Sequence, residues 1–149
     1  MDNAVKIHGA ALGLLGQREH SRRELLTKLA ERFNLPIDAM PLQQCLDKLA
    51  ADGYQSDERF AEVFVRSRRA RGYGPVFIEQ ELRRRGVNIE LVTDSVRRSD
   101  EGWLAAVSDV KRKKFGAGLV TALQEKAKVA RFLQYRGFLP MQINQALRG

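Results

Sequence analysis

Cysteine and histidine are scarce in this chain of 149 residues. Its only cysteine is Cys45, and its two histidines are His8 and His20. A single cysteine cannot form an internal disulfide, and these few residues lack the spacing of a zinc site. We therefore expect a reduced, cytoplasmic setting and neither a metal ion nor another cofactor.

Long hydrophobic runs are also missing. No segment approaches the roughly 18 uninterrupted apolar residues of a membrane helix, and the N-terminal residues do not have the pattern of a signal peptide. We therefore expect no membrane partner. The chain has only 4 Pro and 12 Gly, with 44% hydrophobic and 30% charged residues, which is typical of a folded globular protein.

The few glycine, proline and capping residues divide the chain into nine helix-length segments without a convincing strand. Residues 21–24 (Ser-Arg-Arg-Glu) and 121–124 (Thr-Ala-Leu-Gln) match the capping box, which satisfies the free amides at a helix start. The dipeptide Gly74-Pro75 ends one predicted helix and begins the next. The sequence therefore predicts an all-α fold.

The predicted helices form three sets of three, and an offset of 51 residues relates the second set to the third. The positions that keep their apolar, glycine or arginine character are Ile78, Leu82, Arg85, Gly86, Val87, Val92 and Val96, aligned with Val129, Leu133, Arg136, Gly137, Phe138, Ile143 and Leu147. We expect three tandem three-helix repeats, residues 1–53, 54–100 and 101–149, in an elongated, curved array with flexible joints.

The positive charge is concentrated in one part of the chain. The formal net charge is +8; residues 1–53 carry 7 Lys and Arg against 7 Asp and Glu, whereas residues 54–149 carry 19 against 11. Such asymmetry is typical of proteins that bind an anionic macromolecule. A surface that only aids solubility is the alternative interpretation.

Basic residues crowd the C-terminal ends of predicted helices. One cation offsets the helix dipole by about 0.3–1 kcal/mol, so three or four at one end exceed that need. We predict that these residues face the anionic partner, together with a tyrosine that could stack on bases: Arg66, Arg68, Arg69, Arg71, Tyr73, Arg83, Arg84, Arg85, Lys111, Arg112, Lys113 and Lys114.

Two other functions are consistent with parts of the sequence. Asp57, Glu58 and Glu62 could hold a magnesium ion, as in a nuclease, because residues four apart share a helix face. Acidic residues in a first helical turn also stabilise the helix dipole, which is the commoner role. Three-helix units with basic ends also suit a helix-turn-helix protein that binds duplex DNA directly.

The second set of helices carries a group of motifs with a known counterpart. The motifs are Asp57-Glu58-Arg59-Phe60-Ala61, Arg66-Ser67-Arg68, Gly72-Tyr73-Gly74-Pro75, Ile78, Glu81-Leu82 and Arg85-Gly86-Val87. Together they resemble the central signature of the RecX family of bacterial recombination regulators. Residues 18–25 and 131–138 add similar matches on either side, so the resemblance covers nearly the whole chain.

This resemblance implies a non-enzymatic regulator in DNA repair, homologous recombination and the SOS response. Members of the family bind RecA filaments on DNA and mostly inhibit strand exchange, ATP hydrolysis and co-protease activity. They act by lying in the filament groove or by blocking filament growth. For this chain we therefore expect a monomer that binds the RecA nucleoprotein filament, with direct contact to single- or double-stranded DNA as a further option.

Overall fold

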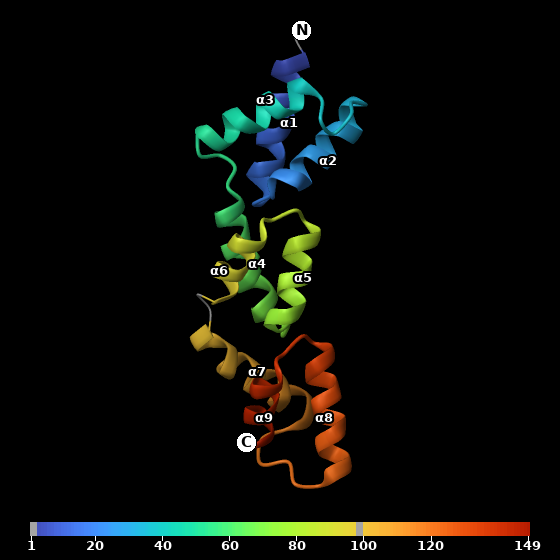
Figure 1. Cartoon of the computed structure of the whole chain (residues 1–149), viewed down its shortest axis with the longest axis vertical. Helices are drawn as coiled ribbons and strands as arrows, with labels where there is room; N and C mark the ends of the chain where they lie inside the picture. The colour runs from blue at the N-terminus through green and yellow to red at the C-terminus, as the bar shows by residue number, and fades with distance from the viewer. Residues whose placement is uncertain (1–2, 98–99) are drawn as a thin grey trace.

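The computed structural model describes residues 3–97 and 100–149. Nine α-helices and no strand are found in these two ranges, which confirms the all-α prediction. Unit 1 contains α1 (Asn3–Gln17), α2 (Arg22–Phe33) and α3 (Met40–Ala51). Unit 2 contains α4 (Asp57–Ala70), α5 (Pro75–Arg84) and α6 (Ile89–Arg97), and unit 3 contains α7 (Asp100–Phe115), α8 (Leu123–Tyr135) and α9 (Pro140–Leu147). The three units follow one another along an elongated body (Figure 1).

Most helices begin where the sequence predicts. Ser21 and Glu24 form the predicted capping box of α2, and the Ser56 side chain accepts a hydrogen bond from the third amide of α4. The predicted capping box at residues 121–124 is wrong. Ala122 is the N-cap of α8 and makes no side-chain hydrogen bond, so Thr121 lies outside the helix.

The buried apolar side chains form two clusters instead of three. Unit 1 has its own core, made by α1, α2 and α3 around residues such as Leu25, Leu29 and Leu46. Units 2 and 3 share one core, which runs from Phe60 to Ala146. Burial of apolar surface is the main favourable term in folding, so units 2 and 3 stabilise each other directly.

Trp103 lies where the shared core passes from unit 2 to unit 3. This α7 side chain is 1% exposed, and its Nε1 donates a hydrogen bond to the Val96 carbonyl of α6 at 3.2 Å. Helix α4 also packs against α7. None of the helices in the described ranges is long and apolar enough to cross a membrane.

Candidate anion-binding groove

The contact between units 2 and 3 is built from backbone atoms. The Gly74 amide donates to the Arg136 carbonyl at 2.8 Å, and the Val76 amide donates to the Gly137 carbonyl at 2.9 Å. A Cβ atom on Gly74 would lie 2.4 Å from the carbonyl carbon of Gly137, and Gly137 itself has a φ of 97°. Only glycine tolerates both conditions, so these residues let the two units approach closely.

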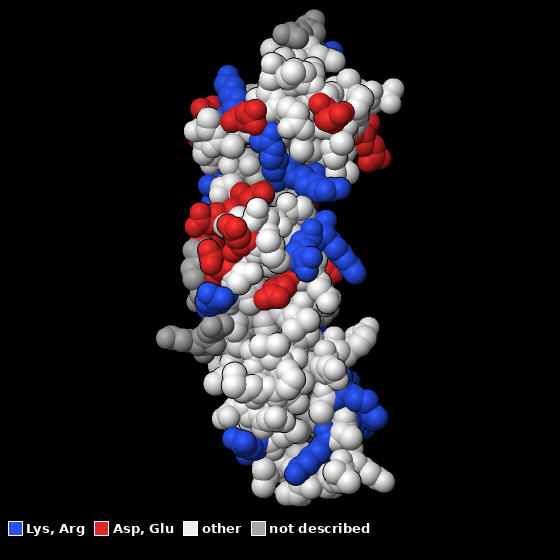
Figure 2. Space-filling model, viewed as in Figure 1, with Lys and Arg blue, Asp and Glu red and all other residues white. Residues whose placement is uncertain are grey.

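A groove opens beside this contact. It lies between the C-terminal end of α4, the length of α7 and the C-terminal end of α8, and its volume is about 620 Å³. Its basic lining residues are Arg66, Arg69, Arg71, Lys113, Lys114 and Arg136. We call this feature the basic groove. On the face shown in Figure 2, basic side chains and no acidic ones are visible over the lower part of unit 3.

Among the lining residues that the structure describes, one carries a carboxylate, Asp109. An oxygen of this carboxylate accepts a hydrogen bond from Arg112 Nη2 at 2.8 Å, and Arg112 is not one of the lining residues. A nearby opposite charge compensates a carboxylate, although an exposed pair of this kind contributes little to stability. The groove therefore keeps a strong excess of positive charge.

The uncharged part of the lining combines Val110 and Phe132 with several small residues. Ala70, Gly72, Ala105 and Ala106 leave room between the basic side chains. Gly102 has a specific role, because a Cβ atom there would lie 2.4 Å from Nη1 of Arg69. The absence of this atom lets the Arg69 guanidinium lie against α7.

Arg136 lines the basic groove and was not among the predicted partner-facing residues. Its Nη1 donates to the Arg71 carbonyl at 3.4 Å, and its guanidinium lies 5.0 Å from the ring centre of Tyr73 and 5.3 Å from that of Phe132. These contacts link unit 3 to unit 2. Two sequence signals could have identified it: the 51-residue repeat aligned Arg136 with Arg85, and Arg136 lies within residues 131–138, which share the family resemblance.

Five of the predicted residues meet in the basic groove: Arg66, Arg69, Arg71, Lys113 and Lys114. Lys111 does not, because its side chain is 3% exposed and its Nζ donates to the Gly118 carbonyl at 2.6 Å. This lysine holds the loop before α8. The Tyr73 ring stacks on Phe77 at 4.2 Å between centroids and is half-buried, so it lies beside the groove wall.

Arg68 and Arg85 lie on the other side of α4. Their guanidinium carbons are 4.3 and 4.7 Å from the ring centre of Phe64, and burial together with the charges of Arg71 and Arg85 lowers the pKa of Arg68. They line a second groove of about 390 Å³, where Glu19 and Glu24 offset part of the positive charge.

Arg71 lines both grooves, so the basic side chains continue from one to the other. Arg83 and Arg84 lie outside both grooves, exposed at the end of α5. Arg84 pairs with Glu81 at 3.5 Å.

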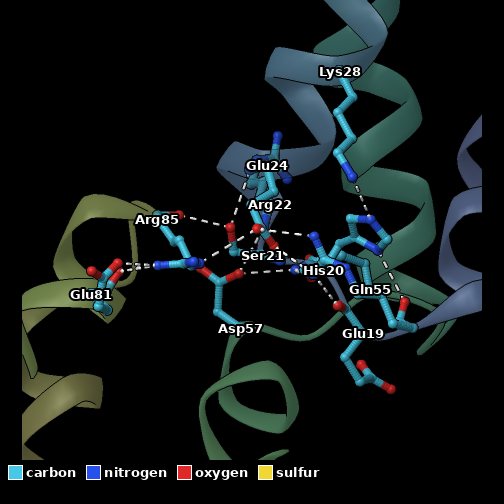
Figure 3. A network of polar contacts seen from close by, with 11 residues as sticks. Glu19, His20, Ser21, Arg22, Glu24, Lys28, Gln55, Asp57, Glu81 and Arg85 are labelled. Atoms are coloured by element: carbon cyan, nitrogen blue, oxygen red, sulfur yellow. Dashed lines mark hydrogen bonds and ion pairs between the residues drawn. The ribbon is translucent and has the colours of Figure 1, made fainter. Parts of the chain in front are cut away.

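The acidic residues that suggested a nuclease do not form a metal site. No group of three or more histidine, cysteine, aspartate or glutamate side chains that could hold a metal occurs in the described ranges. Asp57 Oδ1 instead accepts hydrogen bonds from the Arg22 amide at 2.8 Å and from Gln55 Nε2 at 2.9 Å. Figure 3 shows this carboxylate among the polar contacts between units 1 and 2.

Comparison with known proteins gives the family. Residues 56–95 match the second three-helix domain of RecX, and residues 100–147 match the third. The regulatory protein RecX of Halorhodospira halophila is 45% identical over 140 residues, which cover 94% of this chain and 85% of the relative. The corresponding protein of Pseudomonas fluorescens SBW25 is 37% identical over 149 residues, covering 100% of this chain and 94% of the relative.

Solved structures agree on the fold. The crystal structure of RecX from Lactobacillus salivarius has a TM-score of 0.77 at 19% identity and covers 97% of this chain and 94% of its own. A second crystal structure, of a regulatory protein RecX, has a TM-score of 0.80 at 18% identity and covers 97% of this chain and 73% of its own.

The helical units and the basic groove define a helical-repeat regulatory protein, and the sequence matches specify which one. The chain belongs to the RecX family, as the motifs of unit 2 predicted. Members of this family are regulatory proteins and not enzymes.

Proposed function

We propose that this protein modulates RecA by binding the RecA filament on DNA, and that the basic groove contacts the anionic surface of that filament. The observation that carries the proposal is the gathering of six cationic side chains around one groove whose walls come from two units. Cations placed in this way bind phosphates and release the counterions condensed around them, so the affinity falls as the salt concentration rises.

The elongated shape of the protein suits a filament. Arg71 lines both grooves, whose linings together draw on all three units, and these units follow one another along the elongated body (Figure 1). A monomer lying in the filament groove, or at the growing end, would inhibit strand exchange, ATP hydrolysis and co-protease activity. This activity belongs in the cytoplasm, in homologous recombination and the SOS response.

The test compares two double charge reversals in the full chain. Arg66→Glu with Lys113→Glu changes one lining residue of α4 and one of α7, and Arg83→Glu with Arg84→Glu makes the same change in charge outside the basic groove. We expect the wild-type protein to suppress DNA-dependent ATP hydrolysis by RecA at substoichiometric amounts. The groove variant should need about tenfold more protein, and the control less than about threefold more.

Two results would contradict the proposal. If the wild-type protein has no effect on ATP hydrolysis over a range of ratios, RecA is not the target. If both variants lose activity equally while circular dichroism shows intact helices, the groove is not the contact. Sequence-selective retention of duplex DNA without RecA would favour the helix-turn-helix alternative instead.

Arg68 and Arg69 are poorer choices for this test, although both were predicted to face the partner. Arg68 lies over Phe64, and Arg69 lies 5.5 Å from the ring centre of the buried Trp103. Reversing their charge would remove these cation–π contacts and disturb the shared core as well as the groove.

A further inference from the structure

The basic groove has the dimensions of a small-molecule site. Its volume of about 620 Å³ lies within the roughly 300–1,000 Å³ of sites that hold small ligands. We propose that it binds a small triphosphate anion, supplied either by a nucleoside triphosphate or by inorganic tripolyphosphate. This inference uses the groove of the proposed function but does not need RecA or DNA.

The charge around the groove calls for a ligand of high charge density. Cations reach it from α4, α7 and α8, and the carboxylate of Asp109, the acidic residue among its described lining, is already hydrogen-bonded to Arg112. A triphosphate places several negative charges on adjacent groups. An acidic peptide spaces its charges at least about 3.3 Å apart along an extended backbone, whose bulk would also have to fit.

The side chains needed to grip phosphates are available. Arg66, Lys113 and Lys114 are exposed, and within residues 3–97 and 100–149 none of them has an ion-pair partner. Guanidinium groups bind phosphate oxygens through two parallel hydrogen bonds, and lysine acts as a point charge. The two kinds of cation come from two different helices, α4 and α7.

The groove is formed before any ligand arrives. Its walls belong to units 2 and 3, which share one apolar core and are held by the backbone bonds at Gly74 and Gly137. A ligand therefore does not have to order the two walls, and this saving increases the affinity. The segment 72–74 lacks the glycine-rich phosphate-binding motif, so side-chain cations and not backbone amides would hold the phosphates.

Apolar lining leaves room for the base of a nucleotide. Ala105, Ala106 and Val110 lie along α7 between the cations, and Phe132 borders them from α8. A base covering this surface would favour a nucleotide over the bare phosphate chain. Either ligand would occupy the cations proposed to contact the filament, and so would compete with it.

The experiment titrates a fluorescent ATP analogue, mant-ATP, with the full chain in EDTA, without RecA or DNA. We expect saturable binding that weakens at least tenfold in Arg66→Glu with Lys113→Glu and less than threefold in Arg83→Glu with Arg84→Glu. No saturable binding, or equal weakening in both variants with intact helices, would overturn the proposal.

Displacement of mant-ATP identifies the ligand class. Unlabelled ATP and tripolyphosphate should both displace it, and the one that acts at the lower concentration is the better candidate for the natural source. Displacement by adenosine but not by tripolyphosphate would overturn the proposal, as would equal displacement by a peptide of four glutamates. Failure here leaves the RecA proposal standing, because that proposal is tested separately by ATP hydrolysis.

Discussion

The two contacts between neighbouring units, which we call joints, use the same parts of the repeat but different chemistry. In each, the turn between the second and third helix of one unit packs on the start of the second helix of the preceding unit. Ser21 and Gly74 are the N-caps at these positions. The Ser21 hydroxyl donates to the Arg85 carbonyl at 2.7 Å, and the Gly74 amide donates to the Arg136 carbonyl at 2.8 Å.

The surroundings of these two bonds differ. The joint between units 2 and 3 continues into a shared apolar core. The joint between units 1 and 2 is surrounded by polar side chains, including the pair Arg85–Glu24 at 3.6 Å, whose two residues are labelled in Figure 3. Arg59 and Glu19 form a second pair at 2.7 Å. Salt screens charged pairs and does not weaken apolar contacts. We therefore expect the joint between units 1 and 2, which we call the polar joint, to bend. The joint between units 2 and 3, which we call the fixed joint, should keep its geometry.

The largest effect should come from Gly74→Ala, which breaks the fixed joint. The new Cβ would lie 2.4–2.5 Å from backbone atoms of Gly137 and Phe138, which cannot move away independently. We expect a loss of roughly 3 kcal/mol in the free energy of unfolding, as for overpacking at a tight site. Urea unfolding followed by Trp103 fluorescence measures it, because Trp103 lies at the boundary of the two units.

Gly13→Ala is the matched control for this substitution. Gly13 lies inside α1, and a Cβ atom there would meet nothing within 4 Å. Alanine favours the helix over glycine by about 0.8–1 kcal/mol, so this variant should be more stable or unchanged. Equal destabilisation by the two substitutions would mean that the approach at Gly74 does not hold units 2 and 3 together.

A smaller effect should come from Asp57→Ala, which loosens the polar joint. Its carboxylate accepts hydrogen bonds from the Arg22 amide and the Gln55 side chain. The Arg22 amide would lose this partner, and Gln55 Nε2 would keep its longer bond of 3.4 Å to the His20 carbonyl. We expect a cost of about 1–2 kcal/mol, faster amide hydrogen exchange at Arg22, and a broader distribution of sizes in small-angle X-ray scattering. The urea unfolding transition followed by Trp103 fluorescence should keep its midpoint.

Asp57→Asn separates the hydrogen bonds from the charge. The asparagine oxygen can still accept from the Arg22 amide, so this variant should keep most of the protection against exchange. Added salt should broaden the scattering distribution of the wild-type protein in the same direction as Asp57→Ala. The opposite result would be a shift of the Trp103 unfolding transition with salt and no effect of salt on unit 1. It would mean that the joint between units 2 and 3, and not the joint between units 1 and 2, depends on charge.

The helices could be predicted because their signals are local. Ser21 and Glu24 are three residues apart and form their capping box without help from the rest of the chain. The start of α8 was mispredicted because distant residues fix the loop before it: Lys111 Nζ bonds to the Gly118 carbonyl, and the Val120 amide bonds to the Leu147 carbonyl.

The groove was predictable only in part. Clusters at helix ends identified five of its six cations, since exposure is the usual state of an arginine or lysine. The burial of Lys111 and the position of Arg136 depend on backbone carbonyls, which every residue has and which therefore leave no trace in the sequence.

The smallest effect we expect is a pH response of the polar joint through His20. This side chain is 1% exposed; its Nδ1 lies 3.0 Å from the Arg18 carbonyl and its Nε2 lies 3.1 Å from Lys28 Nζ (Figure 3). The Nδ1 therefore carries the proton and Nε2 accepts from Lys28. Burial, followed by the charges of Arg18 and Lys28, lowers the pKa of His20 despite the bond to the Arg18 carbonyl.

The sign of the response follows from this lowered pKa. Below about pH 6.5, His20 binds a proton in the unfolded chain but not in the folded one. The free energy of unfolding is therefore highest above pH 6.5 and decreases as the pH falls towards the pKa of folded His20. The slope cannot exceed about 1.4 kcal/mol per pH unit for one group. Burial alone would raise the pKa of the neighbouring Glu24, but hydrogen bonds from Arg18 and Ser21 outweigh it and lower this pKa, which keeps Glu24 ionised at mildly acidic pH.

Amide hydrogen exchange of residues 3–51 at pH 7.5 and 5.5, corrected for the intrinsic effect of pH, measures this loss. His20→Gln should remove most of it, because glutamine offers a donor and an acceptor that do not titrate. His8→Gln, on the first helix and away from the joint, should keep it. Two results would contradict this prediction: equal protection of unit 1 against exchange at both pH values, or a pH-dependent shift of the Trp103 unfolding transition instead. Either would mean that His20 does not couple the polar joint to pH, and that only the response to salt distinguishes the two joints.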